Sequence, residues 1–87
     1  MAAKPERFTA DGQSTITLLS GVVFASTTAD TLDLRAGGAG GTIYLTIGVA
    51  ANGTTSLSFD PPIASPTGAW YADVTTTGAP KITLVGN

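Results

Sequence analysis

The sequence predicts an all-β fold, a small antiparallel β-sandwich or barrel of six to seven short strands with an extended N-terminal arm. Apolar and polar residues alternate over short segments, which is the pattern of strands with one buried face. Turn-forming residues recur about every 8–12 residues, as in sandwiches and small barrels. No helical period persists over three turns. With 87 residues the chain has room for one domain and one hydrophobic core.

The first twelve residues differ from the rest in composition. Three of the ten charged residues and one proline fall within four positions, namely Lys4, Pro5, Glu6 and Arg7. A segment this charged and poor in apolar residues does not fold alone. We therefore expect an arm over residues 1–12 and a single domain over residues 13–87. The arm is expected to lie across a neighbouring subunit, with Phe8 filling a pocket and Arg7 pairing with a carboxylate. The alternative is an ordinary frayed terminus.

Alternation predicts three strands before the glycine-rich segment. The first has Ile16 and Leu18 between threonines, the second follows Gly21, and the third places Leu32 and Leu34 on one face. They span residues 13–19, 22–25 and 31–35. Residues 37–41 contain four glycines and are expected to form a flexible loop, because glycine destabilises helices and strands alike.

The second half of the chain predicts four more strands, over residues 42–50, 56–59, 69–75 and 81–85. Asn52-Gly53 predicts a hairpin turn in which both residues have positive φ. Pro61-Pro62 is expected to end the strand on which Leu57 and Phe59 point inward, since neither proline can donate a ladder hydrogen bond. Residues 77–80 predict a turn. The shared parity of these strands predicts a core that contains Ile43, Leu45, Ile47, Val49, Trp70, Val74, Ile82 and Leu84.

Composition argues against catalysis and against cofactors. The chain has neither cysteine nor histidine, which excludes disulfides and the usual nucleophile–base pairs. Carboxylate pairs could be drawn from Asp30 with Asp33 or from Asp60 with Asp73. We interpret Asp30 as a turn cap and Asp33 as a solvated partner of Arg35. The sequence therefore predicts no enzyme, no metal site and no cofactor.

Charge indicates which partners to expect. The net charge is −2 and the four cations form no basic stripe, so nucleic acid is not an expected partner. No segment reaches the ~18 apolar residues of a membrane span, and the N-terminus lacks the apolar region of a signal peptide. Only 11% of the residues are charged, which suits a chain that packs against neighbours. Small size without disulfides leaves oligomerisation as the remaining source of stability, so we expect a homo-oligomer.

Trp70 and Tyr71 are adjacent on one predicted strand, so their side chains point to opposite faces. Trp70 shares its parity with Val74 and is assigned to the core. Tyr71 is then exposed, on the same sheet surface as Tyr44. Exposed tyrosines can anchor an interface or stack on a sugar, although an ordinary half-exposed tyrosine is the commoner case.

From about Ser14 onward the chain resembles small β-rich virion proteins of tailed bacteriophages, which decorate heads or sit at the neck and tail. The segments that carry the resemblance are ITLLS at 16–20, TADTLDL at 28–34, GAWYADV at 68–74 and TGAP at 77–80. It implies a virion structural protein made in the host cytoplasm, a capsid decoration or accessory subunit. Its partners would be the major capsid protein, other virion proteins or copies of itself. The alternative is a small adhesion or carbohydrate-binding β module that uses the two tyrosines. The interface candidates are Arg7, Phe8, Tyr44 and Tyr71.

Overall fold

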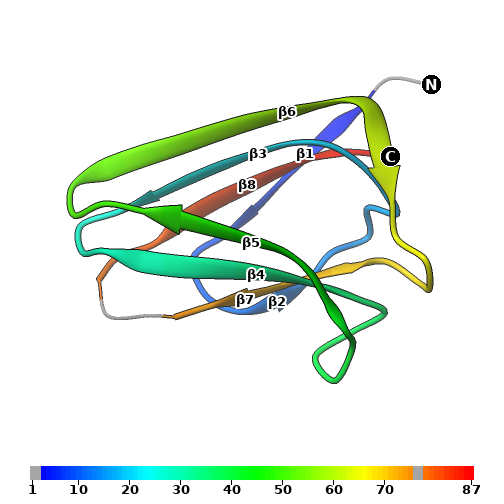
Figure 1. Cartoon of the computed structure of the whole chain (residues 1–87), viewed down its shortest axis with the longest axis horizontal. Helices are drawn as coiled ribbons and strands as arrows, with labels where there is room; N and C mark the ends of the chain where they lie inside the picture. The colour runs from blue at the N-terminus through cyan, green and yellow to red at the C-terminus, as the bar shows by residue number, and fades with distance from the viewer. Residues whose placement is uncertain (1–2, 76–77) are drawn as a thin grey trace.

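The computed structural model of this chain describes residues 3–75 and 78–87. Two four-stranded antiparallel sheets pack face to face as a β-sandwich (Figure 1). The predicted all-β antiparallel class is confirmed, with eight strands in the described residues instead of six or seven. Residues 1–2 of the expected arm and Thr77 of the expected 77–80 turn lie outside the described residues. Within the described part of the chain, no helix is long and apolar enough to cross a membrane.

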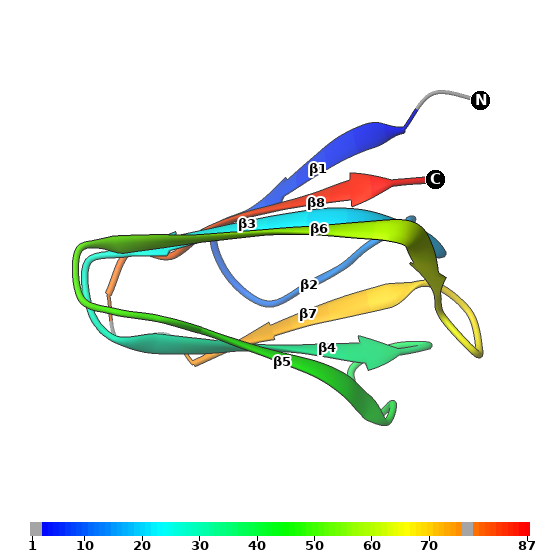
Figure 2. The same cartoon turned by 45° about the horizontal axis from the view of Figure 1, so that its top comes forward.

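Successive strands alternate between the two layers except for β4 and β5, which lie in the same sheet; Figure 2 shows the layers one above the other. Sheet A has the strand order β1-β8-β3-β6, and sheet B has the order β2-β7-β4-β5. The strands are β1 (Lys4–Phe8), β2 (Gly12–Gln13), β3 (Leu18–Ser26), β4 (Asp30–Ala36), β5 (Ile43–Val49), β6 (Gly53–Ala64), β7 (Trp70–Val74) and β8 (Lys81–Gly86). The edge strands are therefore β1 and β6 in sheet A and β2 and β5 in sheet B.

The core lies between the sheets and contains most of the residues that parity assigned to it. Six of the eight predicted members are buried: Ile47, Val49, Trp70, Val74, Ile82 and Leu84. Leu45 is half-buried, whereas Ile43 is 41% exposed and was assigned to the core wrongly. The reason is a register shift between β4 and β5, which pairs Leu45 with buried Leu34 but Ile43 with Arg35. A β-bulge of this kind reverses the alternation on one strand.

The N-terminal segment is part of the sandwich, so an extended arm over residues 1–12 is not confirmed. Strand β1 pairs with β8 from Lys4 opposite Gly86 to Phe8 opposite Ile82. The Phe8 ring packs against the core instead of projecting toward a neighbour. Composition alone predicts an arm, because it does not show that this segment has a partner strand at the far end of the sequence. Once β8 supplies that partner, a charged segment with one apolar anchor is enough for an edge strand.

The connection between β5 and β6 crosses from one sheet to the other and is not the predicted hairpin. The amide of Gly53 donates to the carbonyl of Ala50 at 2.9 Å, and Asn52 alone in this turn has a positive φ, of 57°. Positive φ at the third position only is the pattern of a type II turn. The two strands pair instead with β4 in sheet B and with β3 in sheet A.

Two further strand boundaries differ from the prediction. The predicted strand over 13–19 is not formed as such: Gln13 ends β2 in sheet B, residues 14–17 form no strand, and β3 runs from Leu18 to Ser26. Strand β6 continues through Pro61 and Pro62, which were predicted to end it. Prolines are tolerated on an edge strand because one side of its backbone has no partner. The pairing of β3 with β6 is irregular here: Leu19 lies opposite Ile63 while Gly21 lies opposite Ser58.

Candidate functional site

Each open side of the sandwich is formed by one edge strand from each sheet. Strands β1 and β2 form one side, and β5 and β6 form the other. Figures 1 and 2 together place β5 and β6 nearest the viewer, so Figure 1 looks directly onto the second side. We call this surface the β5–β6 face. The apolar residues that its two edge strands contribute are Tyr44, Leu45, Leu57, Phe59 and Ile63.

Strand β6 contributes apolar side chains that the sandwich covers incompletely. Leu57 lies opposite Val22, which is buried, so Leu57 also points to the inner side of sheet A. It nevertheless remains 39% exposed, because β6 is an edge strand of sheet A. Phe59 and Ile63 are half-buried and pack against the core from the same strand. The core of the sandwich therefore reaches the surface along β6.

Strand β5 contributes Tyr44, the most exposed large apolar side chain of the described residues, at 55%. Its ring lies edge-on to Trp70, with the ring centroids 6.4 Å apart and the planes at 80°. That arrangement is a favourable aromatic geometry. Trp70 itself is fully buried, and its indole nitrogen has no hydrogen-bond acceptor within the described residues. Tyr44 therefore covers the largest core residue while half of its own surface stays exposed.

The two edges are fixed to each other at one end. The Thr55 hydroxyl of β6 donates to the Gly48 carbonyl of β5 at 2.7 Å, next to the 50–53 turn. Away from this end the two strands diverge, as Figure 2 shows. The exposed Leu57 and Tyr44 lie on the diverging parts of β6 and β5, beyond the Thr55–Gly48 contact. The turn and this interstrand hydrogen bond thus join the two strands that carry the apolar surface.

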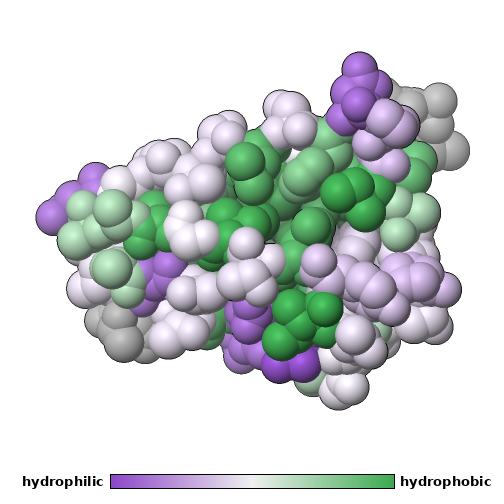
Figure 3. All heavy atoms as spheres, viewed as in Figure 1, coloured by the Kyte–Doolittle hydropathy of each residue, from purple (hydrophilic) through white to green (hydrophobic). Residues whose placement is uncertain are grey.

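Apolar surface gathers along the middle of the β5–β6 face, and hydrophilic residues lie toward its margins (Figure 3). Strand β5 contains no charged residue, and β6 contains only Asp60. The longest dimensions of the molecule, 33 and 26 Å, lie in the plane of this view. An apolar centre with a polar margin is the usual anatomy of a protein interface.

The opposite side of the sandwich is closed by polar contacts. The Glu6 carboxylate of β1 accepts from the Ser14 hydroxyl at 2.5 Å and from the Thr15 amide and hydroxyl at 2.9 and 2.6 Å. Burial raises the pKa of Glu6, but these hydrogen bonds and the charge of Lys4 outweigh it, so the pKa is lowered overall. They tie β1 to the segment that follows β2.

The four interface candidates from the sequence do not come together. Arg7 is exposed and lies opposite Thr83, and Phe8 is directed into the core. Tyr71 is half-buried on the outer face of sheet B, opposite Arg35. Tyr44 instead contacts the inward-facing Trp70, so the two tyrosines do not form one platform.

Sequence reasoning missed Leu57 and Phe59 as surface residues, although it placed both on the inward side of a strand. The available signal was Pro61-Pro62, because prolines within a strand mark a sheet edge. An inward residue on an edge strand is only partly covered.

Three of the four carboxylates of the suggested pairs are engaged in structural contacts. Asp30 is buried and accepts from the Ser26 and Thr28 hydroxyls. Asp73 pairs with the Arg35 guanidinium at 2.9 Å, while Asp33 accepts from a threonine hydroxyl of β5 at 2.8 Å. In the described ranges, no group of three or more acidic, histidine or cysteine residues is placed to hold a metal ion.

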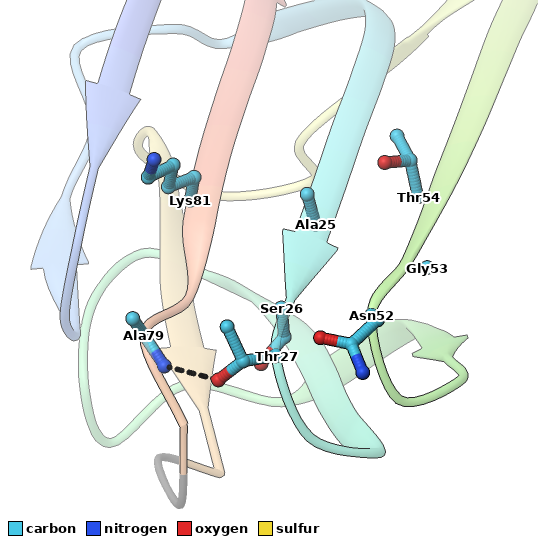
Figure 4. A pocket seen from close by; sticks show the side chains of 8 residues that line it. All are labelled: Ala25, Ser26, Thr27, Asn52, Gly53, Thr54, Ala79 and Lys81. Carbon is cyan, nitrogen blue, oxygen red and sulfur yellow. Dashed lines mark hydrogen bonds between the residues drawn. The ribbon is translucent and has the colours of Figure 1, made fainter.

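A pocket of about 280 Å³ lies at the end of the sandwich where the 50–53 turn meets the loops after β3 and before β8 (Figure 4). Its lining is mostly small and hydroxyl-bearing, with Ser26, Thr27 and Thr54 on one part and Lys81 on another. The Ala79 amide donates to the Thr27 hydroxyl at 3.3 Å across its base. The pocket is open, and hydroxyl and amide groups lie in it among small apolar side chains.

No protein-family model, curated protein or solved structure matches this chain. Its surfaces are therefore the basis on which a function is assigned. Of the two open sides, the β5–β6 side has the longer edge strands and the fewer charged residues on them.

Proposed function

We propose that this chain is a non-catalytic structural subunit of a virion, of the capsid decoration or accessory type found in tailed bacteriophages. In this role it binds the capsid, other virion proteins or copies of itself. The observation that carries the proposal is the β5–β6 face, an apolar surface bounded by two strand edges. A chain that worked alone in water would leave this surface exposed, and contiguous apolar patches on soluble proteins mark interaction sites.

Composition supports the same role. Only 11% of the residues are charged, against roughly 25% in an average soluble domain. The surface is instead covered largely by hydroxyls and glycine, which suit contacts that exclude charge. The three longer segments that resemble phage virion proteins contribute to β3, β4 and β7. These are strands that build the core, so the resemblance supports a shared scaffold, and the β5–β6 face supplies the argument for assembly.

The direct test is to recover particles from lysed cells that carry the gene. The chain should sediment with the particles at a fixed ratio to the major capsid protein, measured by quantitative mass spectrometry. It should stay bound through a wash in about 1 M salt, in which the electrostatic screening length is on the order of 3 Å. An apolar contact does not depend on attraction between charges and is therefore insensitive to this screening. Recovery of the chain only in the unbound fraction would rule out a virion role.

A second function, a small carbohydrate-binding or adhesion module, is favoured by the hydroxyl-lined pocket. Hydroxyl and amide groups such as those of Thr54 and Asn52 can hydrogen-bond a sugar. Binding would be expected at micromolar to millimolar affinity, about 4–8 kcal/mol. Titration calorimetry with a panel of sugars tests this module, and a response that Thr54→Val removes would support it. No heat from any sugar at millimolar concentration would leave the structural role as the proposed function.

A further inference from the structure

We infer that the β5–β6 face is the surface through which two copies of this chain associate, by antiparallel pairing of their exposed strand edges. This inference rests on the proposed role as an assembly subunit, and it names the surface and the partner. Leu57 and Tyr44 are placed within the contact. The 28–30 and 50–53 turns, by contrast, lie at one end of the sandwich.

The first step is that both edges are unprotected. Strand β5 has seven residues and β6 has twelve, and each has a sheet neighbour on one side only. Soluble proteins normally protect such edges with charged side chains, prolines or very short strands. Here the protecting residues gather at one end of β6, as Asp60, Pro61 and Pro62. Residues 53–59 and the whole of β5 contain neither a charged residue nor a proline, so these parts of the two edges lack the usual protecting residues.

The second step is that the geometry suits a twofold contact. Because a short turn joins β5 to β6, the two strands run in opposite directions along the face (Figure 1). A twofold axis lying in the plane of the face therefore brings antiparallel edges opposite each other. The same axis packs the apolar band of one copy on that of the other. Such isologous contacts are the commonest form of homo-oligomer interface.

The third step is that charge and area favour a second copy over an unrelated partner. A twofold contact sets each surface against itself, which is unfavourable where that surface is charged. The β5–β6 face has one charged residue on its two strands, although the chain carries a net charge of −2. A standard interface buries on the order of 800 Å² for each partner, which is less than a fifth of the 4456 Å² surface of this chain.

The test compares two lysine substitutions at equally exposed apolar positions. Leu57 on the β5–β6 face is 39% exposed, and Val23 on the outer face of sheet A is 40% exposed. Sedimentation velocity from about 1 μM to about 1 mM should show a dimer for the wild type and for Val23→Lys. Leu57→Lys should raise the dissociation constant at least about 100-fold, because an unpaired charge would be buried in each copy. Equal dimerisation of both variants, or a monomeric wild type throughout, would overturn the inference.

A second measurement keeps the test decisive if Leu57→Lys fails to fold. The chain has no cysteine, so Leu57→Cys and Val23→Cys each introduce a single thiol of smaller volume. The Leu57→Cys thiol should react with a maleimide at least about tenfold more slowly at high than at low protein concentration. The reaction of the Val23→Cys thiol should not depend on concentration. A Leu57→Cys rate that is equally independent would contradict the inferred contact.

Failure of the inference can be told apart from failure of the proposed function. Particle association of a chain that stays monomeric would overturn the inference and leave the virion role intact. A dimer that never associates with particles would leave the inference standing and remove the virion role.

Discussion

The two open sides of this sandwich are both bounded by edge strands, yet only one side is protected. On the β1–β2 side, β1 carries three charged residues and a proline, and β2 has only two residues. The Glu6 carboxylate adds three hydrogen bonds to the neighbouring segment. These are the devices by which soluble proteins prevent their sheet edges from pairing with other chains.

On the β5–β6 side the strands are longer and almost uncharged, and apolar residues reach the surface between them. A shortage of charged residues in the chain does not explain why β5 and β6 are almost uncharged, because three of the ten charged residues lie on β1. The difference indicates that one edge of this fold is closed while the other is available for pairing. An interface on the N-terminal segment, which composition favours, is therefore less well supported than one on β5 and β6.

The largest loss of stability is expected from a comparison of two substitutions, one in the core and one on the open side. Leu34 and Leu45 are directly paired on β4 and β5, but Leu34 is fully buried and Leu45 is half-buried. Leu34→Ala should lower the free energy of unfolding by about 2–5 kcal/mol. Leu45→Ala should lower it by about 1–2 kcal/mol in the monomer, because less apolar area is lost. Urea unfolding at low protein concentration measures both; equal losses would mean that β5 is as well covered as β4.

A smaller loss of stability is expected from a substitution that disturbs the packing by which the β1–β2 side is closed. A methyl group added at Gly12 would lie 2.5 Å from Cδ1 of the Phe8 ring, so Gly12→Ala should cost about 1–3 kcal/mol of stability. The cost should largely disappear in a Phe8→Ala background, where the ring is absent. A double-mutant cycle by thermal unfolding measures this coupling. Additive losses would show that Phe8 does not close this side.

The smallest change in stability is expected when acid weakens the contacts of the β1–β2 side. Because the pKa of Glu6 is lower in the folded chain, its ionised form stabilises the fold above the ordinary value of 4.5. This contribution should be lost as the pH falls below 4.5 and through the lowered pKa of the folded state. Glu6→Gln should therefore destabilise the chain at pH 7 and have little effect at about pH 3. Asp60→Asn, on the opposite edge, is the exposed control; a pH-independent loss for Glu6→Gln would contradict the assigned contacts.

Six of the eight residues that the sequence assigns to the core are buried. Alternation identifies the inward residues of β4, β7 and β8, because the period of two depends only on local backbone geometry. It assigns Ile43 wrongly because a bulge next to Arg35 depends on how β5 pairs with β4. The number of residues between β4 and β5 does not reveal such a shift in their register.

The candidate site is less predictable than the core, because exposure of an inward side chain depends on strand order. The sequence places Leu57 inward but does not show that β6 is an edge. It likewise detaches residues 4–8 from the domain, since their partner strand begins at Lys81. Both features arise from pairings between distant parts of the chain, and local patterns carry little information on these.

Amide hydrogen exchange of the wild-type chain, measured at low and at high protein concentration, tests whether copies of this chain meet through β5 and β6. Exchange is slowed where a strand edge gains a partner, so each peptide reports on its own edge. We expect slower exchange at high concentration for peptides covering residues 43–64 and no change for residues 4–13. Slowing confined to residues 4–13, or no change at any edge while the chain is dimeric, would contradict the claim.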